Sequence, residues 1–289
     1  MGMIYGLDVR TGKPTWQLNL IDIEEDFAQK YNSSGTKTQG DSFEIALSER
    51  SLVISSLMII DSILVFSAHY STYAVDLATR SLLWKEHGGE ALVHQPWSVY
   101  NQMLFGLVPA DNNGMKCLEV YDLCERQESV WGDIEANGLH ELYTEGVVPI
   151  ADGIVFLTTH DRLRAFDVLT GEALWSVSVP DSDYLAIANG MVYSVSVSGK
   201  VWSLDTRSLQ MRWEHQLQLS ERYQSYDVPP SYANDMLYVG RSDGLITALD
   251  AHSGGIQWSC KLEGIVTVPC TITDKAVCVA AGKKIYALY

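Results

Sequence analysis

The chain of 289 residues carries 36 acidic side chains against 20 lysines and arginines, a formal net charge of −16. A surface this acidic repels phosphate backbones and anionic lipid headgroups, so nucleic acid and membrane surfaces are excluded as expected partners. Hydrophobic residues make up 47% of the chain, which is enough for a packed core. We therefore expect a folded protein whose partners are neutral or cationic.

The sequence contains no apolar run long enough to cross a bilayer as a helix, so no membrane insertion is expected. Its first residues lack the basic stretch and apolar run of a signal peptide. The cysteines are odd in number and widely scattered, which is typical of reduced thiols: Cys117, Cys124, Cys260, Cys270 and Cys278. These features predict a cytoplasmic protein, with the periplasm or the extracellular space as the alternative if an export segment has been removed.

A repeat runs along the chain, because six of the eight tryptophans follow an aspartate at nearly constant spacing. The pairs are Asp8 and Trp16, Asp76 and Trp84, Asp122 and Trp131, Asp167 and Trp175, Asp205 and Trp213, and Asp250 and Trp258. The frame recurs about every 40 residues, with one longer gap between the first two copies. That gap predicts a loop insertion at 20–51 in an otherwise regular array.

Each repeat has the pattern of β-strands separated by tight turns. Residues before each aspartate alternate and favour β-branched or aromatic types, and glycine pairs such as Asn189-Gly190 and Asp243-Gly244 mark turns. After the aspartate, an Asp-x-x-Thr-Gly segment predicts a hairpin, since the carboxylate can accept turn N–H groups and glycine takes the positive φ. The tryptophan then opens the outer strand, where it can seal the gap against a neighbouring sheet.

The strand count predicts an all-β fold, a β-propeller of four-stranded antiparallel blades in a single domain over residues 1–289. Five full units are expected over residues 52–88, 90–135, 144–180, 184–218 and 224–262, with three further strands in 264–289 and two in 3–20. Six blades with one surplus strand follow, and seven blades are the alternative. We expect the strand around Pro14–Leu20 to complete the sheet begun at 264–289, so that N- and C-terminal strands close the ring.

At these repeats the sequence resembles the PQQ-like β-propeller family, whose repeat joins a Tyr-Ala-Leu-Asp segment, a Thr-Gly turn and a Leu-Trp pair. Thr-Gly is complete at Thr11-Gly12 and Thr170-Gly171 and nearly so at Ser253-Gly254, while Arg80, Arg126 and Ser208 occupy turns that have drifted. The resemblance implies the fold and not an activity, because the family contains quinoprotein dehydrogenases as well as non-catalytic propellers, among them a periplasmic lipoprotein that helps to assemble outer-membrane barrels.

No catalytic, cofactor or metal constellation stands out. The quinoprotein dehydrogenases that the repeat resembles carry adjacent cysteines beside their cofactor, whereas no two cysteines are adjacent here. The seven histidines show no metal-binding spacing, and neither a Gly-x-Ser-x-Gly elbow nor a glycine-rich phosphate loop occurs. We therefore expect no cofactor, no metal and no catalytic residue, and we interpret the repeat aspartates and tryptophans as structural.

Two regions are candidates for partner binding. The insertion at 20–51 mixes acidic residues with Phe27 and Tyr31, and it should overhang the propeller face that holds the connections between blades. Other loops of that face combine aromatic and polar residues of the kind that interfaces favour: His94, Trp97, His140, Tyr143, Tyr184, Tyr223 and Tyr226. For both regions a purely structural role is the alternative.

Two functions remain open at this point. The first is a non-catalytic interaction or scaffold module that presents its loop-rich face to a protein or peptide partner, with a cationic partner favoured by the charge. The alternative is an enzyme or a small-ligand or metal-binding propeller of the quinoprotein type that uses the central channel. Sites in that channel draw single residues from several blades, so a linear motif would not reveal them.

Overall fold

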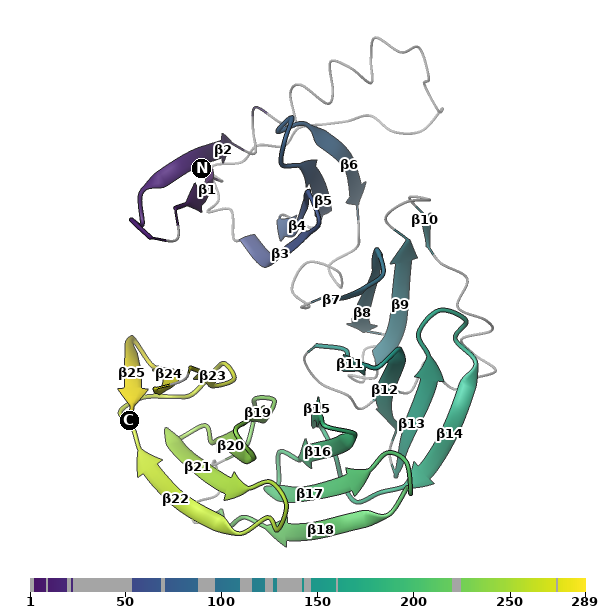
Figure 1. Ribbon diagram of the computed structural model, residues 1–289, viewed down its shortest axis with the longest axis vertical. Coiled ribbons are helices and arrows are strands. Elements are labelled where there is room, and N and C mark those ends of the chain that lie inside the picture. Colours follow the sequence, from purple (N-terminus) through teal and green to yellow (C-terminus); the bar gives the residue numbers. More distant parts are fainter. Residues whose placement is uncertain are drawn as a thin grey trace. The chain divides into compact units, whose positions relative to one another are not determined.

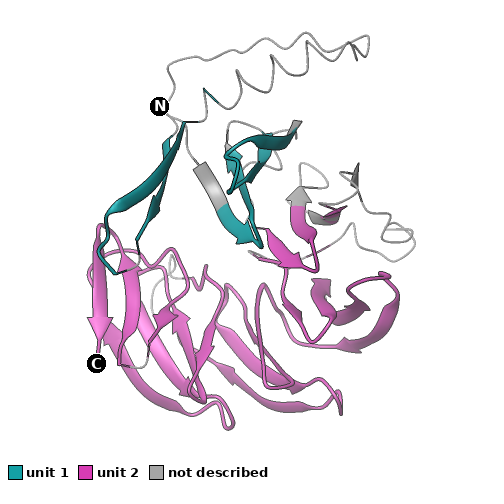
Figure 2. Cartoon of the chain, turned by 45° about the horizontal axis from the view of Figure 1, so that its top comes forward, with its two compact units in different colours: residues 1–96 teal, residues 97–289 magenta. Residues whose placement is uncertain are grey.

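The structure of the chain is a computed structural model. It describes residues 3–8, 10–19, 22, 54–68, 71–87, 97–109, 116–122, 127–128, 142, 147–159, 161–219, 225–273 and 275–289. The chain divides into two compact units, residues 1–96 and 97–289 (Figure 2). Apart from Asp22, the insertion predicted at 20–51 lies outside the described residues. The single domain over residues 1–289 stays a prediction.

The N-terminal unit is built of a hairpin and one four-stranded sheet, both antiparallel. The hairpin pairs β1 (Met3–Leu7) with β2 (Pro14–Asn19), and the sheet is formed by β3 (Ile54–Ile60), β4 (Ile63–Ala68), β5 (Ser71–Asp76) and β6 (Leu82–His87). Ile4 and Leu18 of the hairpin pack in one buried cluster with Phe66 and Tyr73 of the sheet. The hairpin and the sheet are therefore layered face to face.

The C-terminal unit is built of four four-stranded sheets and one three-stranded sheet (Figure 1). The first two are formed by β7 (Ser98–Tyr100), β8 (Met103–Pro109), β9 (Lys116–Asp122) and β10 (Gln127–Glu128), and by β11 (Ile150–Ala151), β12 (Ile154–Thr159), β13 (Arg162–Asp167) and β14 (Ala173–Ser178). The next is formed by β15 (Tyr184–Ala188), β16 (Met191–Val195), β17 (Lys200–Asp205) and β18 (Met211–Gln216). The last two are formed by β19 (Ser231–Ala233), β20 (Met236–Gly240), β21 (Leu245–Asp250) and β22 (Ile256–Lys261), and by β23 (Thr271–Ile272), β24 (Val277–Ala281) and β25 (Lys284–Leu288).

Within the C-terminal unit the sheets follow one another in chain order. The first strands β11, β15, β19 and β23 lie side by side in that sequence (Figure 1). Each gap between neighbouring sheets is filled by its own hydrophobic cluster. The predicted all-β fold with five four-stranded units, three strands at the C-terminal end and two at the N-terminal end is confirmed for the described residues. The number of blades and the closure of a ring by Pro14–Leu20 stay predictions.

Sheets in the middle of this series are buried on both faces, as strand alternation requires. In β12, Val155 and Leu157 pack toward β8 and β9, whereas Phe156 packs toward β16 and β17. The same alternation occurs in β20, where Leu237 and Tyr238 enter different clusters. Both faces must therefore be apolar, which explains the nearly continuous hydrophobic character of the second and third strands.

The repeat aspartates cap the hairpin turns between third and fourth strands, as the sequence predicted. Asp167 Oδ1 accepts the backbone N–H groups of Leu169 and Thr170 at 3.0 and 2.9 Å, and the Thr170 hydroxyl at 3.1 Å. Corresponding bonds are made by the carboxylates of Asp8, Asp76, Asp205 and Asp250. Residues 123–126, which follow Asp122, and Trp131 lie outside the described part of the chain.

The fifth residue of each described turn adopts a positive φ. Gly12, Gly171 and Gly254 have φ values of 66°, 72° and 72°, while Arg80 and Leu209 adopt 60° and 55° at the same position. The drifted turns therefore keep the turn geometry without glycine. In the turn after Asp205, the residue in the left-handed region is Leu209, and Ser208 takes the place of the threonine.

Each described repeat tryptophan lies opposite a small residue of the third strand. The register pairs Trp16 with Gly6, Trp84 with Ala74, Trp175 with Ala165, Trp213 with Ser203 and Trp258 with Ala248. Trp213 shows how the indole then seals the gap to the next sheet: its Nε1–H donates to the Ala251 carbonyl at 2.9 Å. A Cβ added to Gly254 would lie 2.6 Å from the indole of Trp213, so this glycine is needed for close approach as well as for its φ.

These contacts predict different costs for two glycine substitutions in the same unit. Gly190 has a φ of 71° but only ordinary contacts, the nearest at 3.7 Å, whereas a Cβ at Gly254 would overlap both Trp213 and His215. Gly190→Ala should cost about 1–2 kcal/mol from the left-handed backbone. Gly254→Ala should cost about 1–3 kcal/mol more, because it also overpacks the contact between sheets. Urea unfolding of both variants measures the difference, and equal losses would contradict this account.

The turn caps also predict a pH dependence of stability. Hydrogen bonds from Thr170 lower the pKa of Asp167, and those from Ser253 lower the pKa of Asp250, from the ordinary value of 3.8. Because the folded pKa is depressed, the stabilisation is present above the unfolded pKa and is lost as the pH falls through the folded pKa. Asp167→Asn with Asp250→Asn keeps acceptor oxygens but removes titration, so melting temperature should fall less steeply below about pH 4 than in the wild type.

Asp167→Ala provides the control for that experiment, because it removes the cap itself. Its melting temperature should be lower than that of the wild type at neutral pH as well as in acid, since the N–H groups of Leu169 and Thr170 lose their acceptor. An acid limb of the double Asn variant as steep as that of the wild type would show that other carboxylates dominate acid unfolding.

Candidate interaction face

Part of the predicted partner face lies in the C-terminal unit. It consists of the connections from fourth strands to the next sheet, residues 179–183 and the described parts 217–219 and 225–230 of the following connection, and of the turns between second and third strands, residues 196–199 and 241–244. We call these four segments the loop face. They are joined by backbone hydrogen bonds: Tyr226 N–H donates to the Val197 carbonyl at 3.3 Å, and Ser242 N–H donates to the Ser225 carbonyl at 2.8 Å. The connections are therefore fastened to the turns of the sheets that they join.

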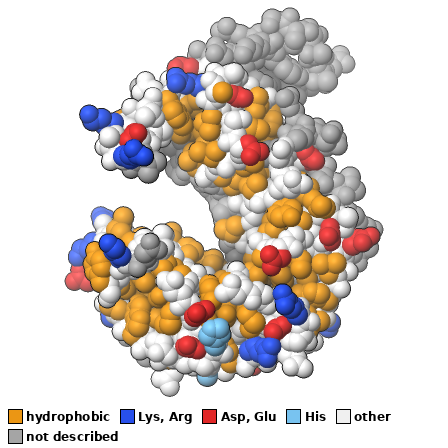
Figure 3. All heavy atoms as spheres, in the orientation of Figure 1, with side chains coloured by type: hydrophobic (Ala, Val, Ile, Leu, Met, Phe, Trp, Pro, Cys, Tyr) orange, Lys and Arg blue, Asp and Glu red, His pale blue; other side chains and the backbone are white. Residues whose placement is uncertain are grey.

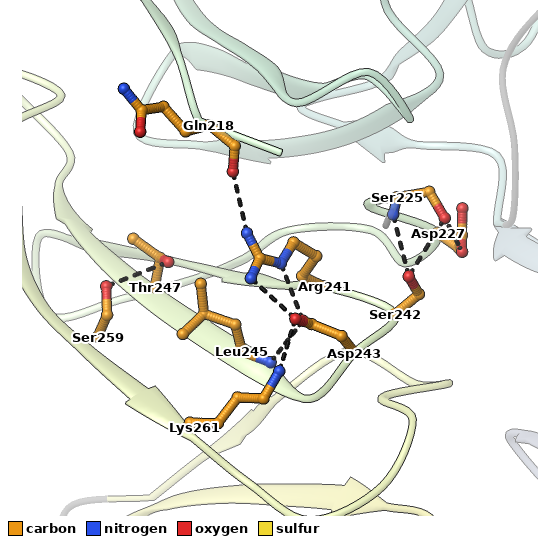
Figure 4. A network of polar contacts seen from close by, with 10 residues as sticks. All are labelled: Gln218, Ser225, Asp227, Arg241, Ser242, Asp243, Leu245, Thr247, Ser259 and Lys261. Atoms are coloured by element: carbon orange, nitrogen blue, oxygen red, sulfur yellow. Dashed lines mark hydrogen bonds and ion pairs between the residues drawn. The ribbon is translucent and has the colours of Figure 1, made fainter. Parts of the chain in front are cut away.

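Arg241 is the centre of the polar contacts in this face (Figure 4). Its guanidinium donates from Nε and Nη2 to the two carboxylate oxygens of Asp243, at 2.8 and 2.9 Å, and from Nη1 to the Gln218 carbonyl at 2.9 Å. Lys261 adds a bond to Asp243 at 2.5 Å. With Arg241 only 8% exposed, this paired charge ties the connection at Gln218 to the turn at Asp243.

Electrostatics keep the Asp243 carboxylate ionised. The hydrogen bonds from Arg241, and after them the bond from Lys261, hold the pKa of Asp243 well below its usual range, and the same pairing raises the pKa of Arg241. Sequence reasoning missed Arg241 and treated Asp243-Gly244 only as a turn. The available signal was the arginine directly before the turn, because an ion pair between residues two positions apart, here Arg241 and Asp243, can fix the conformation of a turn.

Tyr226 lies inside this face and not on its surface. It is 1% exposed, and a Cβ added to Gly199 would lie 3.0 Å from its ring. Burial raises the pKa of the Tyr226 phenol. As placed, the side chain packs the connection against the neighbouring turn, and a role in partner binding stays a prediction.

An acidic part of the loop face remains accessible around the connection at 179–183. Asp183 Oδ2 accepts the Val197 N–H at 2.7 Å, and the hydroxyls of Ser182 and Ser194 share a buried hydrogen bond at 2.6 Å. Asp181 is exposed beside them and receives a long bond from Ser198, at 3.4 Å. A carboxylate held on an ordered connection is suited to meeting a cationic group.

The other candidate residues fall into two groups. Trp97 precedes β7, outside the strands, but its indole is only 8% exposed and covers Gly106 of β8. Tyr184 is half-buried against the cluster around Tyr193. The remaining candidates lie outside the described residues: Phe27, Tyr31, His94, His140, Tyr143 and Tyr223. The structure therefore brings none of the described aromatic candidates together at an exposed site, and partner binding by this set stays a prediction.

Side chains that could ligate a metal are dispersed in the described part of the chain. No group of three histidine, cysteine or acidic side chains that could hold a metal ion occurs there. Cys260, Cys270 and Cys278 are free thiols, and burial raises the pKa of Cys270 to about 11. These residues do not fit a quinone site with adjacent cysteines. No helix among the described residues is long and apolar enough to cross a bilayer.

The Arg241 network predicts a specific loss of stability. Arg241→Met leaves the Gln218 carbonyl without its donor and Asp243 with a weakened set of partners, and should cost about 2–3 kcal/mol. Lys261→Met should cost less than about 1 kcal/mol, because the Lys261 side chain is 56% exposed and the solvent screens the pair. Urea denaturation compares the two variants. A loss for Lys261→Met as large as that for Arg241→Met would contradict the assignment of the anchoring role to Arg241.

Comparison with known proteins finds a matching family and relatives of this chain. Residues 73–226 and 221–289 match the family described as outer membrane protein assembly factor BamB. BamB from Yersinia pestis is 20% identical over 99% of this chain and 79% of its own length. The crystal structure of BamB from Moraxella catarrhalis superimposes with a TM-score of 0.62 at 14% identity, covering 99% of this chain and 78% of that one.

A second set of relatives is longer. The dehydrogenase subunit of the quinone alcohol dehydrogenase from Gluconacetobacter polyoxogenes is 25% identical over 59% of this chain, and the match spans only 26% of that subunit. Because the family match covers most of its length, the chain belongs to the PQQ-like repeat family of β-propellers, whose description names the outer membrane protein assembly factor BamB.

Proposed function

We propose that this chain is a non-catalytic interaction module that binds a polypeptide partner and acts as a scaffold or assembly factor. The observation that carries the proposal is the similarity to BamB along 99% of the chain, in sequence and in fold. That relative is named outer membrane protein assembly factor. The name supports a protein as the partner of this chain and a location that the chain reaches by export.

The loop face is the part of the C-terminal unit that we propose for partner contact. Its connections are fastened by the Arg241 network, so they present a fixed surface that loses little conformational entropy on binding. Exposed Asp181 and Asp227 favour a cationic segment of the partner. Residues 20–51, with Phe27 and Tyr31, are the second proposed contact.

Charge reversal at one residue tests the loop face. Asp181→Lys should lower the rate of partner association severalfold at low salt, since a rim carboxylate mainly steers a cationic partner, and the effect should fade at high salt. Glu172→Lys is the matched control: it changes the same charge at an exposed turn at the opposite end of the preceding sheet. Affinity capture from extracts of the native host would first identify the partner, and biolayer interferometry with the purified partner would then measure the rates.

Two outcomes decide the proposal. If the wild-type chain retains no protein from either a soluble or an envelope extract at low ionic strength, the interaction role is wrong. If Asp181→Lys and Glu172→Lys behave alike with a captured partner, the role stands but the loop face does not carry it. Replacement of residues 20–51 by a short Gly-Ser link, assayed in the same way, measures the contribution of that segment separately.

The second candidate function is a quinone- or metal-binding propeller, which the match to the alcohol dehydrogenase subunits favours. Elemental analysis and an absorption spectrum of the protein purified from its native host test it directly. Stoichiometric metal or a quinone chromophore would support this candidate. A spectrum with only the aromatic protein band and no metal would eliminate it.

A further inference from the structure

A four-stranded sheet ends, opposite the loop face, in two turns, one between its first and second strands and one between its third and fourth strands. In four described sheets these two turns are joined by a backbone hydrogen bond of 2.8–3.0 Å. The donor is the N–H that follows the repeat aspartate, and the acceptor is the carbonyl of the second residue of the turn after the first strand. The bonds run from Leu77 to Ser62, from Val168 to Gly153, from Thr206 to Gly190 and from Ala251 to Asp235. The acceptor residue is therefore held beside the residue that follows the donor.

The β19–β22 sheet differs from the other three in the two side chains that this bond brings together. The pairs in the other sheets contain no carboxylate and no imidazole: Ser62 with Ala78, Gly153 with Leu169, and Gly190 with Arg207. In the β19–β22 sheet the pair is Asp235 with His252. Asp235 adopts a φ of 58° at the position that glycine holds in the two preceding sheets. The geometry of the turn therefore does not explain why an aspartate stands there.

The separation of these two side chains suits two ligands of one metal ion. Nε2 of His252 lies 3.6 Å from Oδ1 of Asp235, which is too long for a hydrogen bond. With bonds of about 2.0–2.2 Å from zinc to nitrogen and to oxygen, this separation corresponds to an angle of about 120° at the metal, near the tetrahedral value. An imidazole nitrogen and a carboxylate oxygen are ligands that zinc takes in proteins.

Two further side chains orient the Asp235 carboxylate. Its Oδ1 accepts the Tyr232 hydroxyl at 2.8 Å, and the Tyr232 oxygen accepts Nδ2 of Asn189, from the preceding sheet, at 2.9 Å. The Tyr232 ring is stacked on that of Tyr193, with the ring centroids 5.4 Å apart. Carboxylates that ligate metals are typically held by hydrogen bonds of this kind, which fix the direction of the ligating oxygen.

Both ligand side chains are accessible, and the turns that carry them are fixed. The side chains of His252 and Asp235 are 75% and 64% exposed, and in the space-filling view histidine and acidic side chains lie together at the surface of this unit (Figure 3). The Ser253 N–H donates to Asp250 at 2.8 Å, which holds the turn directly after His252. With two ligands from this chain, the remaining positions of a tetrahedral ion are open to water or to a group of another molecule.

We propose that Asp235 and His252 bind a divalent transition-metal ion of the zinc class, with Tyr232 as a positioning residue. The site goes beyond the proposed interaction role, and it uses no residue of the loop face. Its ligands stand on two different turns of the sheet, so no linear metal-binding motif marks them in the sequence.

Isothermal titration calorimetry of the full chain with Zn²⁺ tests the proposal. His252→Ala and Asp235→Asn should each weaken Zn²⁺ binding by about tenfold or more. His215→Gln is the control for the imidazole, because His215 is exposed and contacts the Ser253 carbonyl next to the same turn. Asp152→Asn is the control for the carboxylate, because Asp152 is exposed in the corresponding turn of the β11–β14 sheet. Both controls should bind Zn²⁺ as the wild type does.

Cu²⁺ provides a spectroscopic readout that a general loss of structure would not imitate. Its electron paramagnetic resonance spectrum with the wild-type chain should show coupling to an imidazole nitrogen, which should disappear in His252→Ala and persist in His215→Gln. Tyr232→Phe should keep the nitrogen coupling and weaken Zn²⁺ binding by about tenfold, because the carboxylate loses its donor while the histidine stays. Circular dichroism before each titration shows that the variants are folded.

Three results would overturn the proposal: no saturable Zn²⁺ binding to the wild-type chain at up to millimolar concentration, equal binding to His252→Ala and His215→Gln, or equal binding to Asp235→Asn and Asp152→Asn. Unchanged affinity in Tyr232→Phe would overturn the positioning role. Metal that stays bound in His252→Ala belongs to another part of the chain, which separates this site from the quinone- or metal-binding candidate. Partner capture through the loop face does not depend on any of these outcomes.

Discussion

The contact between a tryptophan and the small residue opposite it is the constraint on which the rest of the architecture depends. The described fourth strands share one register with their third strands, because an indole fits over glycine, alanine or serine and not over the larger residues on either side. A slip of one residue would turn the tryptophan to the other face of the sheet. Register within a sheet and packing between sheets are therefore decided by the same side chain.

The turn after each aspartate joins this contact to the next sheet. At Gly254 a positive φ serves the turn, and the missing side chain makes room for Trp213 from the preceding sheet. Leu209 shows that the turn alone tolerates a larger residue. Glycine is thus required most strictly where the local turn and the contact between sheets fall on one residue. Stability in this series is shared between neighbouring sheets, as in other repeat proteins.

The sequence predicted the fold well because repeated signals average out local ambiguity. Five described copies of the aspartate cap and five described tryptophan pairs each confirm a residue type at a fixed spacing. The site was predicted less well, because aromatic residues in loops satisfy packing and binding equally. Trp97 and Tyr226 are buried through contacts with Gly106 and Gly199, which lie on strands or turns that no local pattern connects to them.

Arg241 is a residue whose role in the folded chain the sequence did not predict. Its partners Asp243 and Gln218 belong to a turn and to a connection between sheets, and only the folded chain brings the Gln218 carbonyl to its guanidinium. Nothing in the repeat frame specifies an arginine there. Pairing of this kind is visible in a sequence only when both partners are local, as Arg241 and Asp243 are.

Departures from the repeat are therefore more informative about function than the repeat itself. Residues that obey the frame are accounted for by the turn caps and by the contacts of the tryptophans with the third strands. Asp181 in the loop face is not accounted for in this way, because its exposed carboxylate receives a long bond from Ser198 on a connection that Asp183 fastens to Val197.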